Sequence, residues 1–424
     1  MSTTMITPDY ALLKQPADRS DASLEKGELR LRAVGLFLAG ALSGIDVRIL
    51  GLLPVGEIIL TCSCLLVQAG DFRRKGTFDF GFGSKTMKWL VAMQVVALAG
   101  LICTDIWRES YPNDFLRGWM RMILLLVDVV GFSVLSNRSW RLLVFFQYGL
   151  ILSALSVFVV PPLFGDYWKF GFGGSATILA LWLLPKLRSR AAAMVGIGSL
   201  AVLHYLLGAR GSALILLPTL LALCVLSFQR SRRKVVALVM LVILAGSFIV
   251  GKSLVMERRS EGGEQSNVER MAMMRTAWEG FLQSPLLGHG SWFSRSDLNQ
   301  RFVQIRSNLA YDLGGGLGFD DAADGQVAVH SQILMALAEG GIFGGSFFIT
   351  YIIILILALW RRVMEMEWTA GAPLEISILI GSFYGTFMSP FSGPHLLYIA
   401  FGAVTAASIL KGFTIGSSSE EEMP

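Results

Sequence analysis

Long apolar runs alternate with short polar segments along most of the chain. A bilayer core about 30 Å thick needs about 20 apolar residues in a helix, and the sequence holds about twelve runs of roughly that length. They cover residues 30–46, 51–69, 88–106, 117–135, 142–160, 172–185, 191–208, 212–228, 235–251, 331–360, 373–391 and 394–410. The pattern predicts an all-α polytopic integral membrane protein with about 12 transmembrane helices.

One long polar stretch, residues 252–329, interrupts this pattern. The predicted organisation is therefore a disordered N-terminus (1–29), a first group of transmembrane helices (30–251), a large loop (252–329), a second group (330–410) and a disordered tail (411–424). The polar first residues predict an uncleaved anchor rather than a signal peptide. The two groups differ in loop length, which argues against the internal symmetry of many transporters.

Lysine and arginine gather at one end of the predicted helices. The chain is 54% hydrophobic and 16% charged, with a net charge of +5. The basic clusters are Arg73–Lys75 with Lys85 and Lys88, Arg138 with Arg141, Lys186–Arg190, Arg230–Lys234, Arg361–Arg362, and Lys411. Because cytoplasmic ends carry an excess of such residues, this end and both termini are predicted to be cytoplasmic. The 252–329 loop is then periplasmic, and the charge reports topology rather than nucleic-acid binding.

The cysteines and the histidines occupy different parts of the predicted topology. All the cysteines fall inside predicted spans, so we expect neither a disulfide framework nor a cysteine metal site; they are Cys62, Cys64, Cys103 and Cys224. All the histidines lie at or beyond the outer boundary; they are His204, His289, His330 and His395.

The large loop contains a predicted amphipathic helix. Ser266 and Glu269 form a capping box that opens the helix, and Pro285 ends it. Its apolar residues recur at helical spacing and predict a helix lying along the outer interface or against the bundle; they are Met271, Met274, Ala277, Trp278, Phe281 and Leu282. A glycine-punctuated turn, PLLGHGSWF, follows at residues 285–293.

Arg270 is the most unusual residue of this helix. At 100° per residue it projects within about 40° of Met274, Ala277 and Phe281, on the apolar stripe. A guanidinium there must either find an anion or extend to the lipid headgroups. The two interpretations are a snorkelling arginine and a ligand of phosphate, which a guanidinium can bind through two hydrogen bonds.

Two further residues at the outer boundary could carry chemistry. Arg210 lies in the outer turn LLGARGS, against the charge bias, and is either a headgroup anchor or an anion ligand. His330 begins the tenth predicted span, where the helix dipole disfavours a charged ring. A neutral histidine can act as a general base on a hydroxyl; the alternative is a capping or interfacial histidine.

Several other charged residues are possible supporting groups. Arg117 and Arg121 lie one helical turn apart and could add positive potential to the same cavity, or snorkel. Glu339 is predicted to be a packing or gating residue rather than a partner of His330. Two carboxylates, Glu57 and Asp128, fall inside predicted spans, where such residues mark functional interiors. Asp320, Asp321 and Asp324 are interpreted as a solvated acidic loop in preference to a metal site.

Taken together, these motifs resemble the O-antigen ligase and O-antigen polymerase superfamily, which are bacterial GT-C type membrane glycosyltransferases. The resemblance rests on the ARGS turn, an arginine ahead of PLLGHG, and HSQILMALAEGGIFGG at residues 330–345. Glu339, Gly341 and Gly344 fit the family helix. Met274 replaces a typical aromatic residue, and Ser331 stands where asparagine is common.

The resemblance implies transfer of a glycan from an undecaprenyl-diphosphate carrier to an acceptor hydroxyl at the periplasmic face of the inner membrane. Arg210 and Arg270 would neutralise the diphosphate and His330 would be the general base. Arg117, Arg121, Glu339 and His289 would be supporting residues. No metal and no nucleotide cofactor is expected, because the lipid diphosphate is already activated.

Three alternatives remain open at this stage. A ligase would use lipid A core as the acceptor, whereas a polymerase would use another glycan with the same donor chemistry. A transporter or flippase of lipid-linked sugars would instead show paired broken helices in both halves. A non-catalytic scaffold would leave Arg270 unexplained.

Overall fold

The computed structural model describes residues 19–48, 52–81, 84–136, 142–158, 167–168, 172–186, 189–240, 261–293, 297–312, 329, 331–388 and 393–411. Nearly all of them are helical, which confirms the predicted all-α class. The α-helices are α1 (Arg19–Ala41), α2 (Val55–Lys75), α3 (Lys85–Arg108), α4 (Pro112–Leu135), α5 (Leu143–Leu152), α6 (Gly173–Leu183), α7 (Arg190–Leu206), α8 (Arg210–Ser227), α10 (Glu261–Gln283), α11 (Leu298–Asp312), α12 (Gln332–Met364), α13 (Ala372–Met388) and α14 (Gly393–Lys411). Short 3₁₀ turns are η2 (Ser153–Phe158), η5 (Leu184–Lys186) and η6 (Ser291–Phe293).

A small antiparallel hairpin precedes α2. Its strands, β1 (Asp46–Arg48) and β2 (Leu52–Pro54), pair with Val47 opposite Leu53. The predicted span 51–69 therefore starts later, at Val55. Pro54 is extended (φ −61°, ψ 134°) at the boundary, where its missing N–H costs the helix no hydrogen bond.

Five helices in the described part of the chain are long and apolar enough to cross a membrane. They are α2, α3, α4, α8 and α12. Shorter apolar helices of 10–17 residues occupy Leu143–Leu155, Arg190–Leu206, Ala372–Met388 and Leu396–Lys411. The order of the predicted apolar segments thus agrees with the helices, while the number twelve is not confirmed. The predicted span 142–160, for instance, turns into a 3₁₀ helix at Ser153.

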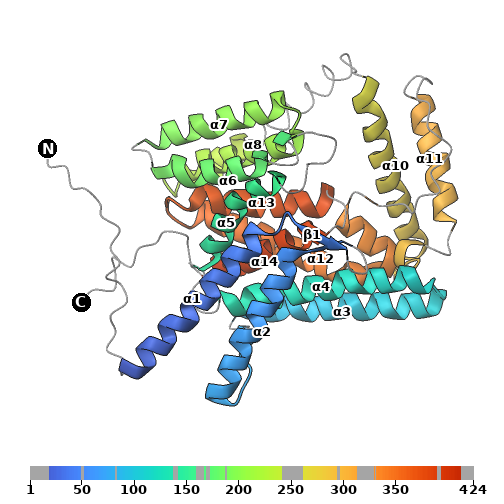
Figure 1. Ribbon diagram of the computed structural model, residues 1–424. Helices are drawn as coiled ribbons and strands as arrows, with labels where there is room; N and C mark the ends of the chain where they lie inside the picture. The colour runs from blue at the N-terminus through green and yellow to red at the C-terminus, as the bar shows by residue number, and fades with distance from the viewer. Residues whose placement is uncertain are drawn as a thin grey trace.

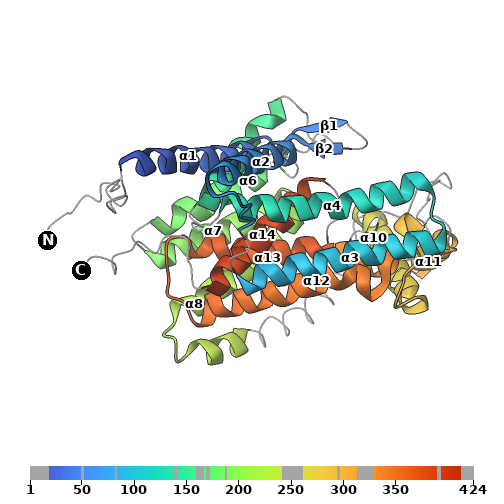
Figure 2. The same cartoon turned by 90° about the horizontal axis from the view of Figure 1, so that it is seen from below.

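Helix α3 lies between α4 and α12 and packs against both (Figures 1 and 2). Helices α3 and α12 run antiparallel, since Gly100 lies against Phe343 whereas Leu101 lies against Gly340. A Cβ atom on Gly100 would come within 2.6 Å of the Phe343 side chain. Such small residues let membrane helices approach closely.

Helices α10 and α11 stand at one end of this group (Figure 1); they pack on each other, and α10 also packs on α12. The contact buries Ala272 and Ala277 of α10 together with Phe302 of α11 and Met335 of α12. Because α10 approaches its neighbours through small residues, the larger Met271, Trp278 and Leu282 of the predicted apolar stripe remain about half exposed.

The expected start of the amphipathic helix is wrong. α10 begins at Glu261, so Ser266 lies inside the helix and does not open it. Glu264 and Gln265, which favour helix, continue it toward the N-terminus. Its end at Gln283, ahead of Pro285, is as predicted.

Buried arginines anchor the opposite end of α12. The Arg362 guanidinium forms an ion pair with Glu375 of α13 and donates to the Glu367 carbonyl at 3.0 Å. Arg233 donates to the carbonyls of Val363 and Met366 at 3.1 and 2.7 Å. Basic residues that the sequence marks as topology signals therefore also stabilise this helix end.

Candidate functional site

The 285–293 turn and a break in α12 interlock. Gly341 adopts φ 62°, ψ −155°, which interrupts the helix. The Ile342 N–H then donates to the Pro285 carbonyl at 2.8 Å, while His289 and Gly290 donate to the Ala338 and Glu339 carbonyls, both at 2.9 Å. Backbone groups that leave the helical ladder are thus satisfied by the turn.

Glycine is required on both sides of this contact. A Cβ on Gly341 would lie 2.2 Å from the Leu286 carbonyl oxygen, and a Cβ on Gly288 would lie 2.4 Å from the Glu339 carbonyl oxygen. Both residues also have positive φ, 62° and 68°, which side chains other than glycine rarely adopt. The glycines of PLLGHG and AEGG are therefore parts of one tertiary contact.

The end of α3 holds the other side of the 285–293 turn. Asp105 accepts hydrogen bonds from the Ser291 N–H at 2.6 Å, the Ser291 hydroxyl at 2.7 Å and the Trp119 indole at 2.8 Å. Arg108 donates to the Gly288 carbonyl and to the Ser284 hydroxyl, each at 3.0 Å. Such charge-assisted bonds are the stronger ones in proteins, so this turn is fixed from two helices.

A buried ion pair lies directly beneath the turn. The Arg121 guanidinium donates to both carboxylate oxygens of Glu339, at 2.9 and 2.8 Å, and stacks 4.6 Å from the Trp292 ring centroid. The Trp292 N–H donates to the same carboxylate at 2.8 Å. The two charged side chains are only 13% and 4% exposed, so solvent screens their attraction weakly.

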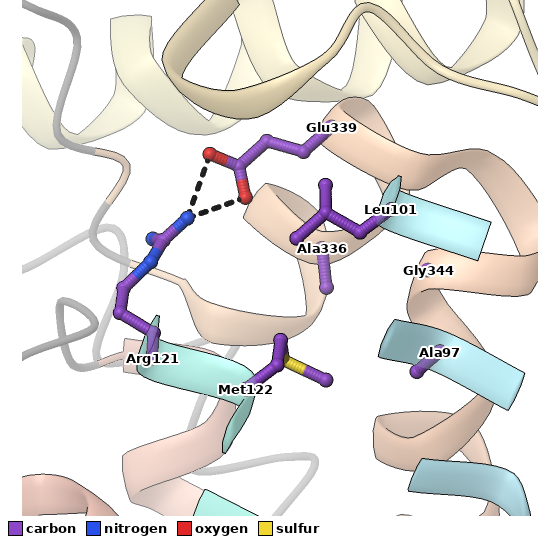
Figure 3. A pocket seen from close by; sticks show the side chains of 7 residues that line it. All are labelled: Ala97, Leu101, Arg121, Met122, Ala336, Glu339 and Gly344. Carbon is purple, nitrogen blue, oxygen red and sulfur yellow. Dashed lines mark hydrogen bonds and ion pairs between the residues drawn. The ribbon is translucent and has the colours of Figure 1, made fainter. Parts of the chain in front are cut away.

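A small pocket opens beside this pair (Figure 3). It is lined by Ala97, Leu101, Arg121, Met122, Ala336, Glu339 and Gly344, from α3, α4 and α12. In this structure the space for solvent is about 10 Å³, which is room for about one water molecule. The Arg121–Glu339 pair forms the polar part of the pocket lining, and the other lining residues are apolar or glycine. The pocket lies near the end of the bundle where α12 begins.

The interlocked turn and helix break lie within a recognised domain. Residues 176–349 match a family model described as O-Antigen ligase. A comparison with curated proteins found no match. Over these residues the chain is similar to the O-antigen ligase family. The matched segment runs from α6 to the middle of α12, so it holds Arg210, Arg270 and the contact between the 285–293 turn and Gly341.

Within the O-antigen ligase domain, the two arginines predicted to bind phosphate have exposed side chains. Arg210 is the first residue of α8 and lies two residues after Gly208, which has a positive φ of 77°. Arg270 lies on α10. Both side chains are exposed, and neither forms an ion pair or hydrogen bond with any residue that the structure describes. Their proposed roles stay predictions.

His330 lies outside the described residues, as do Asp320, Asp321 and Asp324. Its neighbour Ser331 is buried and caps α12, accepting a hydrogen bond from the Leu334 N–H at 3.4 Å. A serine at this position therefore performs the capping that the helix start needs. No group of His, Cys, Asp and Glu in the described residues could hold a metal ion.

The described histidines of the outer boundary are engaged in structural bonds. His289 bonds through Nε2 to the Gly280 carbonyl at 3.0 Å, and burial lowers the pKa of its ring. His204 accepts from the Trp168 indole at 3.2 Å and contacts the Thr177 hydroxyl at 2.7 Å. His289 thus joins the 285–293 turn to α10.

The other supporting residues behave in different ways. Arg121 was expected to add positive potential, but Glu339 offsets its charge. Arg117, one turn away, is exposed. Glu57 and Asp128 are brought together on parallel helices, because α2 and α4 also align Leu60 with Gly131. This gives the two intramembrane carboxylates a partner that spacing alone left unnamed.

Sequence reasoning missed two site residues, Asp105 and Trp292. Asp105 is an acid at the end of an apolar run, which was the available signal for it. Trp292 stands inside the quoted PLLGHGSWF turn, yet nothing in its spacing marked it out. Their environment is tertiary, because it combines α4, α12 and the 285–293 turn.

Proposed function

We propose that this protein belongs to the O-antigen ligase superfamily and moves a glycan from an undecaprenyl-diphosphate carrier to an acceptor hydroxyl at the periplasmic face of the bacterial inner membrane. Lipid A core is the proposed acceptor, which makes the reaction ligase-like. The proposal includes the predicted topology, with twelve spans, cytoplasmic termini and a periplasmic 252–329 loop. The O-antigen ligase domain supports the general class of reaction.

The observation that carries the proposal is the availability of Arg210 and Arg270. Other arginines of the domain, such as Arg301, are paired with carboxylates, whereas these two are exposed and pair with no described residue. A guanidinium without an internal partner can bind diphosphate oxygens through two hydrogen bonds. Exposed apolar residues of α10, such as Trp278 and Leu282, suit a polyprenyl chain.

In the proposed reaction the acceptor oxygen attacks the anomeric carbon while the bond from that carbon to the diphosphate oxygen breaks. His330 takes the acceptor proton. The electron pair leaves with undecaprenyl diphosphate, whose growing negative charge Arg210 and Arg270 stabilise. The diphosphate is its own leaving group, so the reaction as proposed uses neither a nucleotide nor a metal ion.

Single replacements test these roles. Arg210→Ala, Arg270→Ala and His330→Ala should each lower glycan transfer about 100-fold, the typical loss when one transition-state contact or general base is removed. Arg275→Ala is the matched control, because Arg275 is also exposed on α10 but pairs with Glu279 at 3.0 Å. It should stay within about twofold of the wild type. Full surface-glycan synthesis from all three well-expressed variants would refute the proposal.

A transfer assay with the purified protein identifies the acceptor. The protein is given undecaprenyl-diphosphate-linked glycan with lipid A core, or with no added acceptor. Ligated lipid A core supports the ligase, and a lengthened polymer without added acceptor supports a polymerase with the same donor chemistry. Transport of the lipid-linked glycan without a new glycosidic bond would identify a transporter instead.

A further inference from the structure

Gln332 shares a face of α12 with the ion-paired Glu339. Positions 332, 336 and 339 lie within about 60° of one another around a helix, and Ala336 and Glu339 both line the pocket. The Gln332 side chain is 0% exposed. Its amide oxygen and nitrogen make no hydrogen bond with any residue that the structure describes.

Trp292 presents a second buried polar group at the same end of α12. Its indole N–H is buried and has no hydrogen-bond acceptor among the described residues. The backbone at Trp292 is held in the left-handed region (φ 58°, ψ 15°), and its N–H is fixed by Glu339. A residue other than glycine is strained there, so the surroundings hold the ring in place over Arg121.

Each group adjoins a residue that lines the pocket: Gln332 lies one helical turn before Ala336, and the Trp292 ring stacks on Arg121. Two unsatisfied buried groups beside the pocket lining point to a ligand. An unmet buried hydrogen bond is costly, and native proteins keep few of them. Together, Gln332 and Trp292 offer two kinds of donor and one acceptor, with an aromatic face beside them. A ligand that both donates and accepts hydrogen bonds would satisfy these groups.

The charge of the pocket decides between an anion and a neutral ligand. Arg121 and Glu339 form a pair with no net charge, and the carboxylate would repel a phosphate. The exposed Arg210 and Arg270 form no ion pair with an acid among the described residues. Neutral hydroxyl groups, which donate and accept, match Gln332 and Trp292 better than a diphosphate does.

We propose that Gln332 and Trp292 bind the acceptor sugar, and that they do so separately from the arginines that hold the donor diphosphate. This inference rests on the proposed glycan transfer and assigns the acceptor side of that site. Because the pocket has room for about one water in this structure, binding of a sugar requires it to widen, and rearrangement of the flexible Met122 side chain in its lining would permit this.

The test uses Gln332→Leu and Trp292→Phe in the purified full chain. Initial rates are measured with undecaprenyl-diphosphate-linked glycan as donor, first with lipid A core and then with the donor glycan itself as acceptor. Each variant should raise the acceptor KM about tenfold, as expected for one lost hydrogen bond. The donor KM should change less than about twofold, because the diphosphate contacts remain.

Two controls separate binding from folding. Gln147 of α5 is also a buried amide whose oxygen and nitrogen have no partner in the described chain, so Gln147→Leu is the matched replacement. Both leucine variants should keep or raise Tm, since each removes an unsatisfied amide, but only Gln332→Leu should alter the acceptor KM. Trp107→Phe, on an exposed indole, should change neither.

The outcomes are distinguishable. An unchanged acceptor KM in Gln332→Leu and Trp292→Phe, with wild-type donor kinetics, overturns the acceptor site and leaves the proposed function standing. A wild-type protein that transfers glycan to neither acceptor overturns both. Should Gln332→Leu fail to fold, Gln332→Met keeps the length of the side chain and is subject to the same criterion.

Discussion

At the scale of single residues, the ion pair of Arg121 and Glu339 is the centre of the candidate site. Both side chains are largely buried and both line the pocket, and the Glu339 carboxylate accepts a hydrogen bond from the Trp292 N–H. Removing one member of a buried pair leaves the other charge uncompensated, which costs about 3–5 kcal/mol. The pair therefore stabilises the geometry of the site through the attraction between its two charges, and it adds no net charge.

A double-mutant cycle measures this coupling. Arg121→Ala and Glu339→Ala should each destabilise the protein by about 3 kcal/mol, and the double variant should be more stable than the sum of the two by about 2 kcal/mol. Thermal unfolding in detergent is the measurement. Arg361 and Glu365 form an exposed pair at 3.9 Å and should couple by less than about 0.5 kcal/mol. Additive effects at Arg121 and Glu339 would contradict the role assigned to this pair.

At the scale of elements, the contact between the 285–293 turn and the break in α12 explains why two glycine motifs far apart in the sequence belong together. Each provides backbone hydrogen-bond partners for the other, and Asp105 and Arg108 of α3 form further hydrogen bonds with the turn. The turn connects α10 to α11. The position of α10, and so of Arg270, therefore depends on this contact.

Alanine replacement at Gly341 tests that dependence. A Cβ there meets the Leu286 carbonyl at 2.2 Å and forces an unfavourable backbone conformation. Gly341→Ala should lower stability by about 3 kcal/mol or more and reduce glycan transfer with it. Gly385→Ala in α13 is the matched control, because nothing lies within 4 Å of its Cβ. Wild-type Tm in Gly341→Ala would refute the contact.

At the scale of the whole molecule, the two ends of α12 differ in chemistry. The end at Gln332 meets α10 and the 285–293 turn, while the end at Met364 meets Arg233 and the Arg362–Glu375 pair. An excess of basic residues is typical of cytoplasmic ends. We therefore expect α10 and α11 on the periplasmic side.

Cysteine labelling checks the orientation. In a background without the four native cysteines, Ser307→Cys on α11 and Ser231→Cys near α8 both place a thiol at an exposed position. A membrane-impermeant maleimide added to intact cells should label Ser307→Cys, and should reach Ser231→Cys only after permeabilisation. The reverse pattern would place the candidate site in the cytoplasm.

Composition and periodicity were sufficient for the class of this protein and for most of its helices. Apolar runs of bilayer length predict α3, α4, α8 and α12 within a few residues, because a helix in lipid must be apolar along its whole length. The turn at PLLGHG and the end of α10 before Pro285 also follow from local chemistry, since glycine and proline act on the backbone where they stand.

Part of the candidate site could likewise be predicted from local sequence, and part depends on the tertiary structure. Arg210 and Arg270 could be selected from sequence because a charge beside apolar residues is a local anomaly. The absence of a carboxylate partner for them among the described residues, the pairing of Arg121 with Glu339, and the approach of Glu57 to Asp128 could not, because each depends on which helices lie together. Motif and periodicity describe one segment at a time. A pocket made from α3, α4, α12 and a turn is decided only when tertiary packing brings those segments into contact.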